Sequence, residues 1–172
     1  GVDTTGISDP DGISDDVIFS YQWKRNDSAI SGAINSTYTL VQADVGNTIK
    51  VTVTYTDGGN TQQSVTSSAT SVVTNVNDDP TGSVTISGEA KEDNTLEAVT
   101  TIGDEDGLGT FSYQWTRVGQ DGEEVDIDDA TNSTYTLVQD DVGNTIKVTV
   151  SYTDGGNKIE TLTSSATSVV TN

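Results

Sequence analysis

The feature that most constrains this chain is an internal repeat. The segment NSTYTLVQADVGNTIKVTVTYTDGGN, residues 35–60, returns at residues 132–157, an offset of 97 residues. The two copies differ at only two positions, where Asp140 replaces Ala43 and Ser151 replaces Thr54. Because a repeat of this kind is one structural unit used again, the sequence predicts tandem domains of the same fold.

The repeat also fixes the domain boundaries that we expect. Repeat one covers residues 1–75, repeat two covers residues 76–172, and residues 75–80 form the linker between them. Repeat one lacks a counterpart of the first segment of repeat two, so we expect it to be incomplete at its N-terminal side. Near-identical tandem copies serve length or valency more often than chemistry, which favours a spacer over an enzyme.

The composition excludes several classes of partner. The chain has 27 acidic and 7 basic residues, a formal net charge of −20. Nucleic acids and anionic membrane surfaces are also negative and would repel it, so we expect neither as a partner. With no Cys and no His, the chain offers no disulfide and no zinc site. No apolar run of about 18 residues predicts a membrane span, so no membrane insertion is expected.

The apolar residues, only 31% of the chain, fall in alternating runs. In NTIKVTVSYTD one face is apolar and the other polar; the apolar face is Ile146, Val148, Val150 and Tyr152. The segments at 82–88, 94–102 and 111–115 alternate in the same way. A period of two with one polar face is typical of antiparallel strands. The sequence therefore predicts an all-β protein with about seven strands in each β-sandwich.

Three resemblances refine this prediction. Trp115 on the third expected strand, followed by DVGNTIKVTV, resembles the immunoglobulin-like superfamily. NVNDD at 75–79, DED at 104–106 and YTDGGN at 152–157 resemble the acidic linker and loops of cadherins. YQW, STYTL, DVGNTIKV and YTDGG together resemble the tandem extender domains of giant bacterial repeat-in-toxin (RTX) adhesins, among them biofilm and ice-binding adhesins.

These resemblances imply a fold, a location and a role. The fold would be two tandem Ig-like antiparallel β-sandwich domains with Greek-key connectivity, end to end. The location would be extracellular, secreted or at the bacterial cell surface. The role would be that of a spacer that projects a ligand-binding domain of the adhesin, with neighbouring repeats of the same chain as its only expected partners.

Acidic residues of repeat two should meet at one end of the sandwich. In Ig-like connectivity the N-terminus lies beside the loop between strands two and three and the loop between strands six and seven. This end would collect Asn77, Asp78, Asp79, Asp104, Asp106 and Asp154. Two carboxylates 4 Å apart repel by about 4 kcal/mol at an effective dielectric of 20. Ca²⁺, which takes 6–8 oxygen ligands, is the cofactor expected to neutralise them.

Repeat one contains a similar set of acids at its own outer end. Asp9, Asp11 and Asp57 are the corresponding candidate metal ligands. Asp44, in the turn before the sixth strand, is a further candidate at the linker; the alternative is that it only shapes this turn. For all the acids, the simplest alternative is a solvated, solubilising surface.

The sequence leaves two other functions open. One is a binding module for carbohydrate or protein, which would need an exposed aromatic or apolar patch. The other is homophilic adhesion, although no Trp opens the chain as the cadherin strand-exchange mechanism requires; we expect a monomer. Paired carboxylates can hydrolyse glycosides, but the chain has no His, no Cys and no aromatic-lined cleft to accompany them, so we expect neither an enzyme nor a small-molecule substrate.

Overall fold

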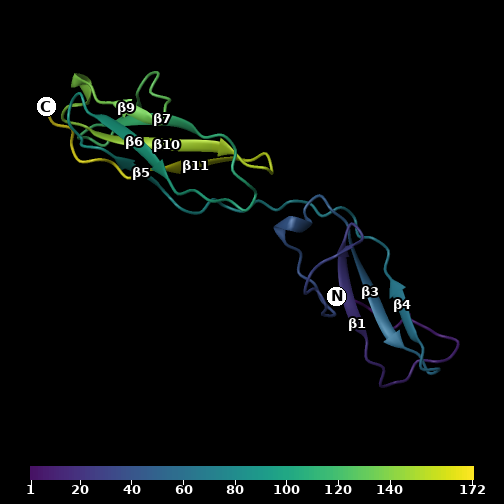
Figure 1. Ribbon diagram of the computed structural model, residues 1–172. Helices are drawn as coiled ribbons and strands as arrows, with labels where there is room; N and C mark the ends of the chain where they lie inside the picture. Colours follow the sequence, from purple (N-terminus) through teal and green to yellow (C-terminus); the bar gives the residue numbers. More distant parts are fainter. The chain divides into compact units, whose positions relative to one another are not determined.

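The computed structural model describes residues 1–172, which divide into two compact units, Gly1–Val76 and Asn77–Asn172. Both units are built from strands (Figure 1). Helical structure is confined to two single 3-10 turns, η1 at Gln42–Asp44 and η2 at Gln139–Asp141. Neither is a helix long and apolar enough to cross a membrane.

Unit 2 has seven strands, as the sequence predicts. They are β5 (Val84–Ser87), β6 (Thr95–Thr100), β7 (Ser112–Val118), β8 (Glu124–Asp126), β9 (Thr134–Thr136), β10 (Thr145–Thr153) and β11 (Ile159–Thr163). One sheet has the order β11-β10-β7-β8, and the other has the order β5-β6-β9. All these pairings are antiparallel. The chain passes from one sheet to the other between β6 and β7, between β8 and β9, and between β9 and β10. These crossing connections confirm the Ig-like sandwich.

The core of unit 2 follows the predicted alternation. Trp115 on β7 lies opposite Val148 on β10 and is fully buried. The apolar face of β10, Ile146, Val148, Val150 and Tyr152, is buried along its whole length. These residues pack with Leu96 and Leu137 from the facing side of the sandwich. Burial of this cluster favours folding by about 25 cal/mol for each Å² of apolar surface removed from water.

Unit 1 has one sheet of four strands, which reproduces the first sheet of unit 2. Its strands are β1 (Ser20–Arg25), β2 (Ser28–Ala29), β3 (Ile49–Thr56) and β4 (Gln62–Thr66), in the order β2-β1-β3-β4. The expectation of about seven strands is therefore met in unit 2 and not in unit 1. β3 buries its apolar face as β10 does: Ile49, Val51, Val53 and Tyr55 are at most 6% exposed.

The second sheet does not form in unit 1 because no strands occupy the places of β5 and β6. In unit 2, β9 is held by its pairing with β6, where Tyr135 lies opposite Leu96. The same STYTL segment in unit 1 has no such partner and is not a strand. One consequence is seen at the leucine of this segment, since Leu40 is 51% exposed whereas Leu137 is fully buried.

Candidate metal centre

In unit 1, three aspartates form a compact cluster. One carboxylate oxygen each from Asp9, Asp11 and Asp57 lie within 4.8 Å of one another. Asp9 and Asp11 come from the loop before β1, and Asp57 follows β3 directly. These are three of the predicted ligands, and the fold brings them together.

Local hydrogen bonds shape this cluster. The backbone N–H of Asp11 donates to Asp9 Oδ1 at 3.0 Å, and the hydroxyl of Tyr55 donates to Asp9 Oδ2 at 3.1 Å. The N–H of Gly58 donates to the carbonyl of Gly12, which joins the two loops. A Cβ at Gly58 would lie only 2.4 Å from the carbonyl oxygen of Asp11. Glycine is therefore required for the loops to approach so closely.

Unit 2 repeats the two bonds to the first aspartate, while its loop-joining bond goes to Asp106 and not to the glycine that follows. The N–H of Asp106 donates to Asp104 Oδ1 at 2.8 Å, and the hydroxyl of Tyr152 donates to Asp104 Oδ2 at 2.5 Å. The N–H of Gly155 donates to the carbonyl of Asp106 at 3.0 Å, so the loop after β6 lies against the loop after β10. Burial, and then the bond to Asp104, raise the pKa of Tyr152, which keeps its hydroxyl a donor.

Two residues at the start of unit 2 reach this cluster. The N–H of Asp78 donates to Asp106 Oδ2 at 2.8 Å, and the amide of Asn77 donates to Glu160 Oε1 at 3.1 Å. Asp79 differs, since its side chain is 92% exposed and lies 3.7 Å from the ammonium of Lys158. The convergence predicted for Asn77, Asp78 and the two loops is observed, while Asp79 lies in solvent at its edge.

Asp154 contains a buried oxygen that has no partner. Its Oδ1 accepts a hydrogen bond from the N–H of Lys158 at 2.8 Å, but its Oδ2 is buried without a donor. The residue is only 5% exposed. Leaving a buried charged acceptor unsatisfied costs more than about 1–3 kcal/mol. A cation bound at this oxygen would remove that cost.

Glu160 on β11 is a further acid beside these loops, and the sequence pattern did not predict it. This residue is 7% exposed and pairs with Lys158 at 2.8 Å. The hydrogen bond from Lys158 and that from Asn77 lower its pKa, against the opposing effect of burial, so it is ionised. The sequence does contain a sign of this residue, since the two copies differ here and unit 1 has Gln63 at the corresponding position.

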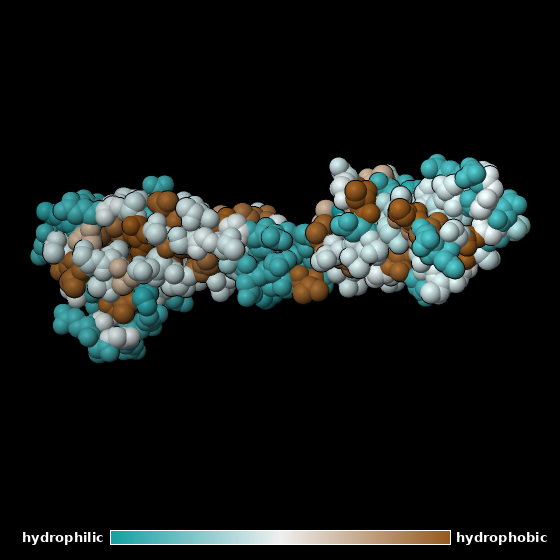
Figure 2. Space-filling model, turned by 90° about the horizontal axis from the view of Figure 1, so that it is seen from below, coloured by the Kyte–Doolittle hydropathy of each residue, from teal (hydrophilic) through white to brown (hydrophobic).

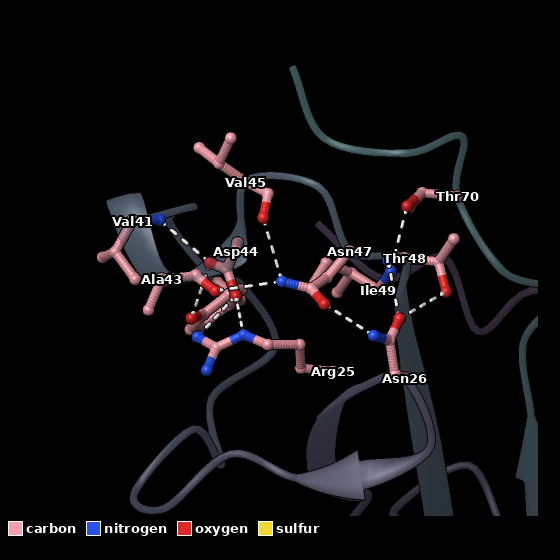
Figure 3. Close-up of polar contacts among 11 residues, drawn as sticks. Arg25, Asn26, Val41, Ala43, Asp44, Val45, Asn47, Thr48, Ile49 and Thr70 are labelled. Atoms are coloured by element: carbon pink, nitrogen blue, oxygen red, sulfur yellow. Dashed lines mark hydrogen bonds and ion pairs between the residues drawn. The ribbon is translucent and has the colours of Figure 1, made fainter. Parts of the chain in front are cut away.

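Asp44 has a different environment from the other predicted ligands. It is fully buried, and both of its oxygens are occupied (Figure 3). Oδ1 accepts bonds from Arg25 at 2.7 Å, and Oδ2 accepts bonds from the hydroxyl of Tyr38 and the N–H of Val41, both at 2.9 Å. Burial acts to raise its pKa, but these hydrogen bonds outweigh it and the pKa is lowered. The contacts favour the structural alternative, in which Asp44 fixes turn η1.

The same carboxylate occurs in unit 2. Asp141 is fully buried and accepts bonds from Arg117, Tyr135 and the N–H of Val138. Burial, and then the bond to Asp141, raise the pKa of Tyr135 to about 12. In both units this turn is therefore fixed by a buried aspartate paired with an arginine of the neighbouring strand.

The donor set of the clusters fits one class of metal. All the candidate ligands are carboxylate, amide or backbone oxygens, which hard cations prefer. Ca²⁺ accepts 6–8 such ligands at 2.3–2.6 Å in irregular geometry, whereas Mg²⁺ requires a near-ideal octahedron. Within residues 1–172 the compact trio of acids is that of unit 1. In unit 2 the ammonium of Lys158 neutralises part of the charge.

The comparison with protein families concerns unit 2. Residues 80–153 match the model of the AIR9 A9 domain, an Ig-like domain. Unit 2 has the Ig-like fold. The matched range contains Asp104 and Asp106 and ends one residue before Asp154. The comparison with curated proteins gave no match. An Ig-like sandwich most often acts as a structural or binding module, and its function has to be argued from its sites.

Proposed function

We propose that this chain is a calcium-stiffened spacer in the extension region of a large secreted bacterial adhesin, where it projects a ligand-binding domain from the cell surface. The observation that carries the proposal is the buried, unpartnered Oδ2 of Asp154 beside the acidic loop of Asp104 and Asp106. A cation is the simplest group that would satisfy this oxygen.

The contacts of the linker explain how metal would stiffen it. Asn77 and Asp78, the first residues of unit 2, are hydrogen-bonded to Glu160 and Asp106. Ca²⁺ held by these carboxylates would immobilise both loops and, through them, the segment that follows Val76. Without the ion, mutual repulsion of the acids loosens the same contacts.

The energy of such a site is sufficient to matter. Extracellular calcium modules have dissociation constants of about 10⁻⁴–10⁻³ M. A free concentration 100 times the dissociation constant adds about 2.7 kcal/mol to the free energy of unfolding. Small domains are stable by only about 5–15 kcal/mol, so calcium would supply a large share in a chain as poor in apolar residues as this one.

The surface gives less support to a carbohydrate-binding module. The exposed large hydrophobic residues are all Ile, Leu or Val, with Ile18, Val76 and Ile159 the most exposed. Figure 2 shows apolar residues on the surfaces of both units, interspersed with hydrophilic ones. Sugar platforms use exposed aromatic rings, and no Trp, Tyr or Phe is classed as exposed. A glycan array in the presence of calcium tests this alternative.

Spin-label distances test the mechanical role. The chain has no cysteine, so labels can be attached specifically at Ser31→Cys in unit 1 and Thr131→Cys in unit 2, both exposed. We expect a narrow distance distribution in CaCl₂ and a broad one in EDTA or MgCl₂. The control pair, Thr131→Cys with Thr161→Cys, lies within unit 2 and should stay unchanged. Equal widths between the units in all three buffers would contradict the spacer mechanism.

A further inference from the structure

Gln63 and Glu160 occupy the same position in the two copies. Gln63 donates a hydrogen bond to an aspartate, whereas Glu160 is an acceptor. We propose that Glu160 is a fourth carboxylate ligand of the calcium site in unit 2, and that Gln63 in its place makes the site of unit 1 the weaker of the two. This inference rests on the calcium binding proposed above and adds an order in which the sites fill.

In unit 1 the amide of Gln63 occupies an oxygen that a metal would use. Its Nε2 donates to Asp57 Oδ2 at 3.0 Å, while the N–H of Thr61 donates to Asp57 Oδ1 at 2.8 Å. Both oxygens of Asp57 are therefore satisfied by the protein itself. A cation that binds here has to displace the amide of Gln63.

In unit 2 the same oxygen is left open. Asp154 Oδ1 keeps its bond from the N–H of Lys158, but Glu160 has no donor to offer Oδ2. Asp154 Oδ2 is therefore a buried carboxylate oxygen that a cation would satisfy. Neighbouring linker residues bind two of the other acids, since the amide of Asn77 donates to Glu160 Oε1 at 3.1 Å and the N–H of Asp78 donates to Asp106 Oδ2 at 2.8 Å.

Lys158 is the counter-charge of this site when no metal is bound. Its ammonium lies 2.8 Å from Glu160, and its side chain is 49% exposed. An exposed lysine can turn into solvent at little cost because its pairing is worth little. Unit 1 has Thr61 at this position and no such cation. Calcium would therefore replace Lys158 in unit 2, with a net gain of coordinating oxygens.

The charge count predicts the order of affinities. Unit 1 offers three carboxylates, which already lie within 4.8 Å of one another, whereas unit 2 would offer four after Lys158 leaves: Asp104, Asp106, Asp154 and Glu160. Calcium affinity rises with the number of charged ligands. Removal of one carboxylate should weaken binding by about tenfold or more, which is the range over which ligand charge tunes such sites.

The test is calorimetric titration of the full chain with CaCl₂. We expect two classes of site in the wild-type protein. Glu160→Gln should weaken the tighter class by about tenfold or more, and the reciprocal Gln63→Glu should tighten the weaker class. Glu123→Gln removes one charge from an exposed loop of unit 2 and should change neither class.

The outcomes separate this inference from the proposed function. No calcium binding to the wild-type chain would overturn both. Two equal classes, or a Glu160→Gln variant that binds like the wild type, would overturn only the role of Glu160. Circular dichroism in EDTA checks that Glu160→Gln folds, as expected from the glutamine already present in unit 1. If it does not fold, Gln63→Glu decides, and unchanged affinity in that variant would reject the inference.

Discussion

Gln63 donates a hydrogen bond to Asp57 across 3.0 Å, from β4 to the loop that precedes it. The copies are nearly identical up to this loop, yet the next strand replaces this donor by Glu160 and leaves Asp154 Oδ2 without a partner. Two sites built from the same pair of loops thus differ in charge and in the oxygens that they leave open.

Gly58→Ala should disrupt the cluster of unit 1. The added Cβ would lie 2.4 Å from the backbone oxygen of Asp11, which cannot move without displacing the loop. We expect a loss of about 1–3 kcal/mol in the free energy of unfolding, as for other overpacked sites, and weaker calcium binding. Gly6→Ala is the control, because no atom lies within 4 Å of its Cβ. Equal stability of the two variants in denaturant titrations would show that the loops do not touch as described.

Tyr135→Phe should destabilise unit 2 by about 1.5–3 kcal/mol, the contribution of a hydrogen bond to a charged group. The hydroxyl of Tyr135 donates to the buried Asp141 at 2.8 Å, and its loss leaves the carboxylate with fewer donors. Tyr113→Phe is the matched control, since no hydrogen bond of the Tyr113 hydroxyl is found in the structure. Urea unfolding measures both. A Tyr135→Phe variant no less stable than Tyr113→Phe would contradict the role of turn η2.

The same tyrosine predicts an alkaline limit to stability. Its pKa is raised from the ordinary value of 10.0 to about 12, by burial and then by Asp141. A raised pKa means that the folded state holds the proton more tightly, so its stabilising effect is complete below pH 10 and is lost as the pH rises from 10 to 12. Urea unfolding at pH 8 and pH 11 should show this loss. Tyr135→Phe should reduce this loss of stability. An equal loss in the variant would show that groups other than Tyr135 cause the pH dependence.

The sequence predicted the parts of the fold that depend on local pattern. The alternation around Ile146 and Trp115 identified buried strands, and Ig-like connectivity brought the Asp104 and Asp154 loops together as observed. Asp44 and Asp141 follow the same acidic pattern but are held by Arg25 and Arg117. Such pairings span 19 to 24 residues and leave no local signal in the sequence.

Two features depended on partners that the pattern does not reveal. The STYTL segment is a strand in unit 2 and not in unit 1, because its pairing partner β6 has no counterpart there. Glu160 lies on β11, and its sequence neighbours Ile159 and Thr161 are exposed. The burial of Glu160 is therefore visible only in the folded structure. A comparison of the copies position by position, with Gln63 against Glu160, would have singled it out.

The central claim is that calcium binds these clusters and stabilises the chain, and thermal unfolding tests it most directly. The same protein would be melted in EDTA, in millimolar CaCl₂ and in millimolar MgCl₂. Stabilisation by about 2.7 kcal/mol corresponds to a rise of about 10–20 °C in Tm for a domain of this size. We predict this rise in CaCl₂ alone, with Asp154→Asn and Asp104→Asn reducing it. Identical melting curves in the three buffers would contradict the account and leave the acids as a solvated surface.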